Sequence, residues 1–131
     1  MPVIQKSTVF EAKTVTTTSP WIDVADAESL SLSIKAASIA SGNGVFVLQG
    51  TIVDGTPAAA DIHDLMLIDN LSNTNTQTPT RVVSKTLSSN VGAILFLDGF
   101  VAKALKRVRV TVTVTTDGSY SAYLFAKRQA N

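Results

Sequence analysis

The chain offers few side chains from which a catalytic or metal site could be built, and its single histidine is the first of them. His63 lies in the run Asp61-Ile62-His63-Asp64, with Asp54 and Asp69 on either side in sequence. A zinc site needs several converging protein ligands, and no spacing such as His-x-x-x-His exists here. A Ser-His-Asp triad would need a nucleophile on a sharp turn, and the chain has no Gly-x-Ser-x-Gly motif. We therefore expect His63 to be a solvated loop residue, with no role in metal binding or nucleophilic catalysis.

The carboxylates and the glycine-rich turn are the next candidates. Asp54, Asp61, Asp64 and Asp69 could bind calcium, but they do not follow the Asp-x-Asp-x-Asp-Gly spacing of an EF-hand loop. Aspartates also cap turns and solvate loop ends, which is the role we expect here. The small number of acidic residues, 10 in 131, argues against a glycosidase pair. The run Gly42-Asn43-Gly44 precedes neither a helix nor Gly-Lys-Ser/Thr, so it is no phosphate loop. The sequence predicts no enzyme, cofactor or metal.

Basic residues gather in one part of the sequence. The cluster consists of Lys103, Lys106, Arg107 and Arg109, and Lys127 and Arg128 could extend it. Arg107 and Arg109 are two positions apart in a strand-like stretch, so they share a face. A solvated face that discourages edge pairing is the simpler interpretation. A contact with an acidic protein surface or a neighbouring subunit is the functional one. A net charge of +1 and few interleaved aromatic residues argue against nucleic acid.

The single tryptophan, Trp21, has two interpretations. A lone tryptophan usually fills a core or anchors the start of a strand. It can also form a stacking platform for a sugar, here together with Tyr120 or Tyr123. The first interpretation is the simpler one, and the second supports an alternative function in carbohydrate binding.

The elements that must position these residues follow from the composition. With 131 residues, 45% hydrophobic and 16% charged, the chain predicts one domain with a core and a surface of uncharged polar residues. It has no cysteine, so disulfides and thiolate chemistry are excluded. The N-terminus lacks a basic region before an apolar run, so we expect no signal peptide, and no apolar stretch is long enough for a membrane helix.

The clearest structural pattern lies in residues 106–127. Valines alternate with arginine and threonine through residues 107–115, and Tyr120, Ala122 and Leu124 alternate with polar or larger residues beyond Asp117-Gly118. This period of two predicts strands with one apolar face. Because Asp-Gly is a strong two-residue turn signal, the pattern predicts a hairpin of two paired strands.

Further strands are expected wherever apolar runs lie between turn signals. They are residues 21–24, 30–34, 45–53 (with a bulge or close approach at Gly50), 65–71, 81–87 and 92–97, with 100–105 leading into the hairpin. Residues 58–64 form a loop with one possible helical turn, and residues 72–80 form a polar loop. About eight strands predict an all-β, single-domain, jelly-roll-like antiparallel β-sandwich. We assign residues 11–131 to the sandwich. Residues 1–10, a first strand or an arm, are assigned as an N-terminal arm.

Five segments carry a resemblance to a known class of protein. They are residues 21–24, 29–34, 47–51, 106–113 and 120–124. An early Trp-x-Asp-Val strand followed by a late Arg-Val-x-Val-Thr-Val strand resembles the small β-sandwich structural proteins of tailed bacteriophages, among them jelly-roll capsid cement (decoration) proteins.

The resemblance implies a non-enzymatic virion protein, made in the bacterial cytoplasm, that binds the major capsid protein and stabilises the head shell. It also implies a homotrimer without affinity for nucleic acid or membrane. A carbohydrate-binding module of a tail or receptor-binding protein, or another head–tail subunit, is the alternative. The arm of residues 1–10, with Val9 and Phe10 as anchors, is predicted to dock on a neighbouring subunit or the shell. Arg107 and Arg109 are the other candidate interface residues.

Overall fold

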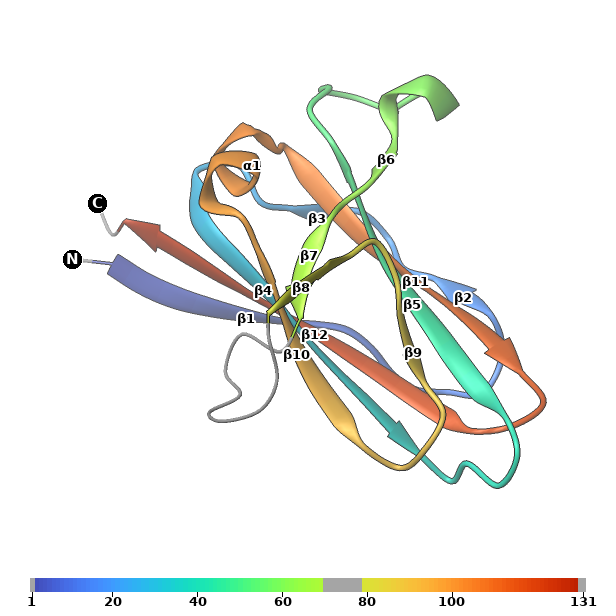
Figure 1. Cartoon of the computed structure of the whole chain (residues 1–131). Coiled ribbons are helices and arrows are strands. Elements are labelled where there is room, and N and C mark those ends of the chain that lie inside the picture. The colour runs from blue at the N-terminus through green and yellow to red at the C-terminus, as the bar shows by residue number, and fades with distance from the viewer. Residues whose placement is uncertain (1, 70–78, 130–131) are drawn as a thin grey trace.

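Two antiparallel sheets pack face to face in the computed structural model, which describes residues 2–69 and 79–129 (Figure 1). The first sheet has the order β1 (Pro2–Lys13), β12 (Ser119–Gln129), β4 (Ala27–Ala37), β10 (Gly92–Leu97), β7 (Leu67–Asp69) and β8 (Thr80–Val82). The second sheet has the order β2 (Thr17–Thr18), β11 (Arg107–Thr115), β5 (Asn43–Thr51) and β6 (His63–Asp64). In addition, β3 (Ile22–Asp23) pairs with β11, and β9 (Lys85–Leu87) pairs with β5.

The strand order confirms the predicted fold class. Strands β1-β12-β4-β10 form one layer, and β2 or β3, then β11, β5 and β9 form the other. This is the jelly-roll-like order, in which strands that follow one another in sequence cross repeatedly between two sheets. The predicted all-β antiparallel sandwich is therefore correct. Six of the strands among the described residues have only two or three residues, namely β2, β3, β6, β7, β8 and β9, and β2 and β3 pair with the same edge of β11.

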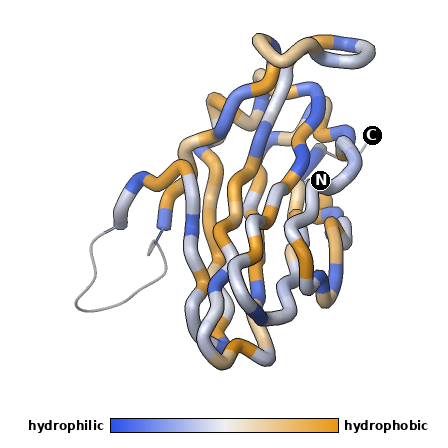
Figure 2. Tube along the Cα trace, turned by 90° about the vertical axis from the view of Figure 1, so that its right-hand side faces the viewer, coloured by the Kyte–Doolittle hydropathy of each residue, from blue (hydrophilic) through white to orange (hydrophobic). Residues whose placement is uncertain are grey.

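The core forms because buried apolar residues alternate with more exposed residues along the long strands. Figure 2 shows the hydropathy of each residue along the same strands. Val110 on β11 and Leu124 on β12 are at most 1% exposed and face each other's sheet. Phe46 on β5 lies at the centre, 6.3 Å from the Phe10 ring and 6.0 Å from the Tyr120 ring, the latter edge-on. Each fully buried aliphatic or aromatic side chain of this kind stabilises the fold by about 1.5–3 kcal/mol.

The predicted hairpin of residues 106–127 is wrong in its pairing, although both strands exist. β11 pairs with β5, β2 and β3, whereas β12 pairs with β1 and β4. The turn between them crosses from one sheet to the other, with Thr116 at φ +70° and Gly118 at φ +116°. A side chain at Gly118 would lie 2.3 Å from the Tyr120 hydroxyl. Both strands bury their apolar faces in the same core, from opposite sheets. The alternation of apolar and polar residues is therefore the same for a hairpin within one sheet and for a connection between two sheets.

The N-terminal segment is part of the sandwich, contrary to the assignment of residues 1–10 as an arm. β1 runs through residue 10 without a boundary and pairs with β12 from Pro2 to Lys13. Val9 and Phe10 are 9% and 6% exposed within the chain's own core, so they are not free to anchor on another subunit. A register shift between Thr8 and Phe10 turns two consecutive residues inward. That bulge is why the sequence shows no clean period there.

Three shorter segments can also be compared with their predictions. The segment 100–105, expected to lead extended into the hairpin, instead belongs mostly to the helix α1 (Gly99–Ala104), whose N-cap Asp98 accepts a hydrogen bond from the Phe100 amide at 2.9 Å. The expected strand 81–87 divides between β8 and β9, in different sheets. The close approach at Gly50 is confirmed, since a Cβ there would lie 2.8 Å from a Leu105 methyl group, but β5 has no bulge.

The expected loop 58–64 is only partly a loop, because its last two residues form the strand β6 against β5. The possible helical turn is present as the 3-10 helix η1 (Ala59–Asp61). Of the expected strand 65–71, residues 67–69 form β7, residues 65 and 66 precede it, and residues 70 and 71 lie outside the described part of the chain. Most of the expected loop 72–80 lies outside the described residues. Within residues 2–69 and 79–129, no helix has the length and apolar character needed to span a bilayer.

Candidate functional site

The residues considered for catalysis do not assemble into a site. His63 is exposed on β6, at the edge of the second sheet. The aspartates make separate contacts: Asp61 accepts from the Ala58 amide at 3.2 Å, Asp64 accepts from the Gln49 side chain at 2.9 Å, Asp69 pairs with Lys85 at 2.7 Å and Asp54 pairs with Lys106 at 3.9 Å. In the part of the chain that the structure describes, no three histidine or acidic side chains are grouped as metal ligands.

The two outer faces of the sandwich carry the exposed polar and aromatic side chains. On the second sheet, one row runs across the strands and consists of Trp21, Arg109, Gln49 and Asp64, with Arg107 beside it; we call this surface the tryptophan face. Arg109 donates from Nε to the Gln49 amide oxygen at 2.9 Å, and Gln49 donates to Asp64 at 2.9 Å. The register places these residues opposite one another on neighbouring strands.

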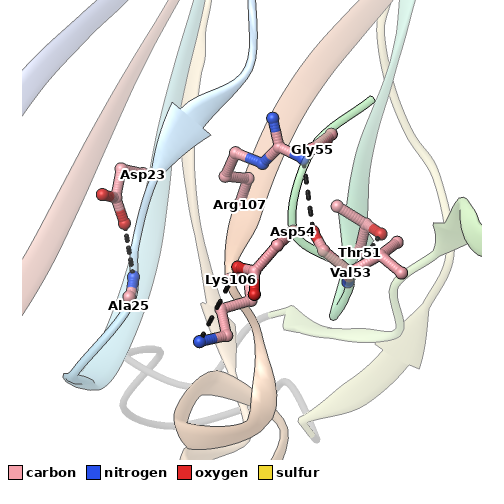
Figure 3. A network of polar contacts seen from close by, with 8 residues as sticks. All are labelled: Asp23, Ala25, Thr51, Val53, Asp54, Gly55, Lys106 and Arg107. Carbon is pink, nitrogen blue, oxygen red and sulfur yellow. Dashed lines mark hydrogen bonds and ion pairs between the residues drawn. The ribbon is translucent and has the colours of Figure 1, made fainter. Parts of the chain in front are cut away.

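Arg107 and Arg109 are held by the chain itself. The Arg107 guanidinium donates to the Val53 carbonyl at 3.2 Å and to the Gly55 carbonyl, in the loop after β5 (Figure 3). The two guanidinium carbons lie 5.9 and 4.6 Å from the centre of the Trp21 ring. A planar cation over an indole ring is favourable, and the cations of this face are therefore already used within the fold.

Two sequence-based interpretations of the basic cluster change as a result. β11 has β5 on one side and β2 and β3 on the other, so its arginines do not protect an exposed edge. Lys127 and Arg128 lie on β12 in the first sheet and do not extend the patch of Arg107 and Arg109. Arg128 instead donates to the carbonyl groups of Asp23 and Ala25. The role of Arg107 and Arg109 as interface residues stays a prediction.

The aromatic residues named for sugar binding are separated by the fold. Tyr120 is 0% exposed in the core, where it donates to the Asp117 carbonyl at 2.7 Å, so it cannot stack on a ligand. Burial, and then the Asp117 charge, raise the pKa of Tyr120 above its ordinary value. Trp21 is half-buried on the second sheet, and Tyr123 is on the outer side of the first sheet. These three rings do not form one platform.

The first sheet has an outer face of a different kind. Its centre is a column of small residues on β4, Ser29, Ser31 and Ser33, with larger side chains on the strands at either side. The residues with outward side chains on this sheet, which we call the serine face, are Ile4, Lys6 and Thr8 of β1; Ser121, Tyr123, Phe125 and Lys127 of β12; Ser29, Ser31, Ser33 and Lys35 of β4; Gly92, Ile94 and Phe96 of β10; Ile68 of β7; and Arg81 of β8.

The pairing register makes the serine column the floor of a groove. Ser31 has Phe125 opposite it on β12 and Phe96 opposite it on β10. Ser33 has Tyr123 and Ile94 in the equivalent positions. Short hydroxyl side chains between longer apolar ones leave a depression along β4, and hydroxyl groups line its floor.

Two hollows reach this column, the smaller one lying on it and the larger one lying mainly beside β9, β10 and the residues that join them. One, of about 220 Å³, is lined by Ile4, Ser29, Ser31, Phe125 and Lys127. The other, of about 640 Å³, includes Ser33, Lys35 and Ile94 in its lining, with the Lys85–Asp69 ion pair in its wall. Ile4 and Ile94 are 73% and 52% exposed, so apolar surface reaches solvent beside both hollows.

Positive charge on the serine face has no carboxylate partner among the described residues. The Lys6 ammonium lies 4.7 Å from the Tyr123 ring centre and the Lys35 ammonium 5.6 Å from it. Neither ion pair of the described chain includes Lys6, Lys35, Lys127 or Arg81. The Tyr123 hydroxyl donates a hydrogen bond to the Glu11 carboxylate at 3.2 Å.

The sequence analysis missed the serine face as a unit. The sequence predicted a strand at residues 30–34, but it could not show that Lys6 and Lys35 lie over the same tyrosine ring. That contact depends on β12 lying between β1 and β4, which no local pattern reveals.

Comparisons with known proteins support the fold. No protein-family model and no curated protein sequence matches the chain. Among solved structures, the fold is similar to that of YomS, a protein derived from the SPBc2 prophage, with a TM-score of 0.61. The match covers 97% of this chain and 95% of that chain at 14% sequence identity. The chain therefore shares the fold of a prophage-derived protein over nearly its whole length.

Proposed function

We propose that this chain is a non-enzymatic structural protein of a tailed-phage virion, and more specifically a cement protein that binds the assembled head shell. The observation that carries the proposal is the full-length structural similarity to a prophage-derived protein, at a TM-score of 0.61. The similarity extends across both sheets, so it concerns the whole sandwich and not a shared motif. It agrees with the resemblance of the strand sequences to phage β-sandwich proteins.

The arrangement of the surface supports a role in assembly. A sandwich with a broad outer sheet face can lie flat on a neighbouring protein, and exposed apolar side chains such as Ile4 and Ile94 suit such a contact. The proposed partner is the major capsid protein, and the proposed assembly state is a homotrimer.

The mechanism would be mass action. A protein that binds the assembled shell but not its separated subunits stabilises the shell by RT ln(1 + [L]/Kd), which is about 2.7 kcal/mol per site at a hundredfold excess over Kd. Attachment through several subunits of an oligomer raises the effective affinity further.

A comparison of phage heads with and without this protein tests the proposal. We expect heads from a phage that lacks the coding sequence to release DNA at a lower temperature than complete heads, and we expect purified protein to restore the difference. Co-sedimentation of the protein with these heads gives the binding, and light scattering across a dilution series gives the oligomeric state.

Two results would contradict the cement function. Heads of equal thermal stability, together with protein that stays in the supernatant, would exclude it. Protein recovered in the tail fraction of disrupted virions would favour the alternative of a tail subunit. A monomer at all dilutions would remove the trimer but leave binding to the head to be decided by co-sedimentation.

A further inference from the structure

The serine face combines uncompensated positive charge with an open apolar centre. Lys6, Lys35 and Lys127 lie along the groove, and Arg81 lies farther out on β8; neither ion pair found among the described residues includes any of them. We infer that the serine face is a docking surface for a protein whose own surface presents glutamate or aspartate side chains around an apolar patch. Such a surface does not require that the protein bind a phage head.

Charge complementarity is the first argument. Apart from Glu11 at the end of the face, which is engaged by the Tyr123 hydroxyl, the paired rows from Ile4 to Lys35 carry lysine and no carboxylate. Opposite charges across an interface favour the correct partner and increase the association rate. The tryptophan face carries two basic groups, Arg107 and Arg109, and both already have hydrogen-bond partners within the chain.

The smaller hollow supplies a place for one carboxylate. Its floor has the hydroxyl groups of Ser29 and Ser31, its sides are Ile4 and Phe125, and the Lys127 side chain completes it. The hydroxyl and ammonium groups can donate hydrogen bonds to a carboxylate, while the apolar sides suit the methylene groups of a glutamate. A volume of about 220 Å³ is suited to a side chain and is below the range of small-molecule sites, about 300–1,000 Å³.

The same observations argue against other occupants. In a face-to-face dimer of this chain, the lysines of one copy would meet those of the other, which is unfavourable. Nucleic acid bases and sugars need open ring faces, whereas Tyr123 has the Lys6 and Lys35 ammonium groups close to its ring. The exposed isoleucines beside the hollows match an apolar protein surface better than a nucleotide.

An NMR titration of the whole chain tests the inference at ~0.15 M salt, where weak surface attraction is screened. The probe is the capped peptide Ser-Glu-Glu-Leu-Leu-Glu-Glu-Ser, and the matched peptide has glutamine in place of every glutamate. We expect saturable shifts of the amide signals of Ser29, Ser31 and Phe125 with the glutamate peptide, and binding of the glutamine peptide that is about three- to tenfold weaker.

Protein variants locate the contact. The double variant Lys6→Gln/Lys127→Gln should bind the glutamate peptide about three- to tenfold more weakly, since two exposed charge contacts are lost. Lys103→Gln is the matched control, because Lys103 is equally exposed but lies on α1. It should bind as the unchanged protein does. All of these side chains are exposed, so the variants should keep their unfolding temperature.

Several results would overturn the inference. They are the absence of saturable shifts on the serine face, equal binding of both peptides, and an effect of Lys103→Gln as large as that of the double variant. Tighter binding of single-stranded oligodeoxythymidylate to the same residues would identify a nucleic-acid surface. Shifts of these signals with protein concentration alone would identify self-association. Because no phage particle is involved, failure here leaves the proposed head binding to its own test.

Discussion

The tryptophan face and the serine face lie on opposite sides of one sandwich, and each combines basic with aromatic side chains. On the tryptophan face, Arg109 is fixed by the Trp21 ring and the Gln49 amide, and Arg107 is fixed by two carbonyl groups. On the serine face, the Lys6 ammonium lies over the Tyr123 and Phe125 rings, and the Lys35 ammonium lies over the Tyr123 ring. The arginines of the tryptophan face are thus bound within the fold, whereas the lysines of the serine face are open to solvent.

The difference follows from geometry. An arginine in the middle of a sheet can donate to neighbouring strands and loops at the same time, because its planar group has five N–H donors. The serine-face lysines take part in neither of the ion pairs found among residues 2–69 and 79–129. Groups that are satisfied internally contribute to stability, whereas unsatisfied charges at a surface contribute to recognition. Substitutions on the two faces should therefore have effects of different kinds.

The largest effect is expected where the two faces are joined. The Asp117 carboxylate, in the turn from β11 to β12, accepts from the amides of Ala40, Ser41 and Gly42, in the turn from β4 to β5. Asp117→Ala should lower the free energy of unfolding by about 3 kcal/mol, because three amides lose a charged acceptor. Urea denaturation measures this value. Asp117→Asn keeps one acceptor oxygen and should lose about half as much. If both variants were as stable as the unchanged protein, the hydrogen bonds to the Asp117 carboxylate would not contribute to stability.

The tryptophan face should respond next. Trp21→Ala should lower the free energy of unfolding by about 2 kcal/mol, since half-buried apolar area and the stacking on Arg109 are both lost. Chemical denaturation followed by circular dichroism measures it, because the fluorescent probe is removed. Trp21→Phe keeps a ring over the guanidinium groups and should lose clearly less. A stable Trp21→Ala protein would mean that this face, too, is free for recognition, and the comparison would fail.

Alkaline pH should lower the free energy of unfolding of the whole sandwich. The pKa of buried Tyr120 is raised, so above pH 10 the folded chain holds a proton that the unfolded chain has lost. This contribution is complete below about pH 10 and is lost at about 1.4 kcal/mol per pH unit above it, up to the raised pKa. Tyr120→Phe should lack this part of the decrease in urea titrations. Amide signals from the two faces should disappear together; separate transitions would show that the sheets unfold independently.

The smallest effect on stability is expected on the serine face. Lys6→Gln and Lys35→Gln should each change the free energy of unfolding by about 0.5 kcal/mol or less, since exposed cation–aromatic contacts contribute little. Thermal and urea denaturation measure this. Arg109→Gln on the other face is the matched comparison and should cost clearly more. A loss on the serine face as large as that of Arg109→Gln would show that its lysines are structural.

Sequence reasoning could predict strands much better than their partners. The alternating residues of β4, β11 and β12 gave their positions and buried faces, because period two is a local property. The partner of each strand depends on contacts between residues far apart, and an Asp-Gly turn permits both a hairpin and an arch between sheets. The sequence could not decide that the turn at Asp117 crosses the core.

The same limit applies to the candidate sites. The shared face of Arg107 and Arg109 followed from their spacing, but their ring partner, Trp21, comes from a segment that joins β11 only in the folded state. Val9 and Phe10 were predicted to anchor an arm on another subunit, because a bulge interrupts the alternation that would have identified them as core residues. The helix α1 was missed because six residues with a single cap carry little periodic signal.

The position of β12 has a consequence for the synthesis of the protein. β12 lies between β1 and β4, and it is translated after both of them (Figure 1). Until β12 has been synthesised, β1 and β4 lack the strand that pairs with both of them. Unpaired strand edges favour aggregation, so the incomplete chain should be prone to aggregate. Tyr123 and Phe125 arrive only with β12, so an interrupted translation product has no complete serine face. The chain thus gains its docking surface in the same step that completes its first sheet.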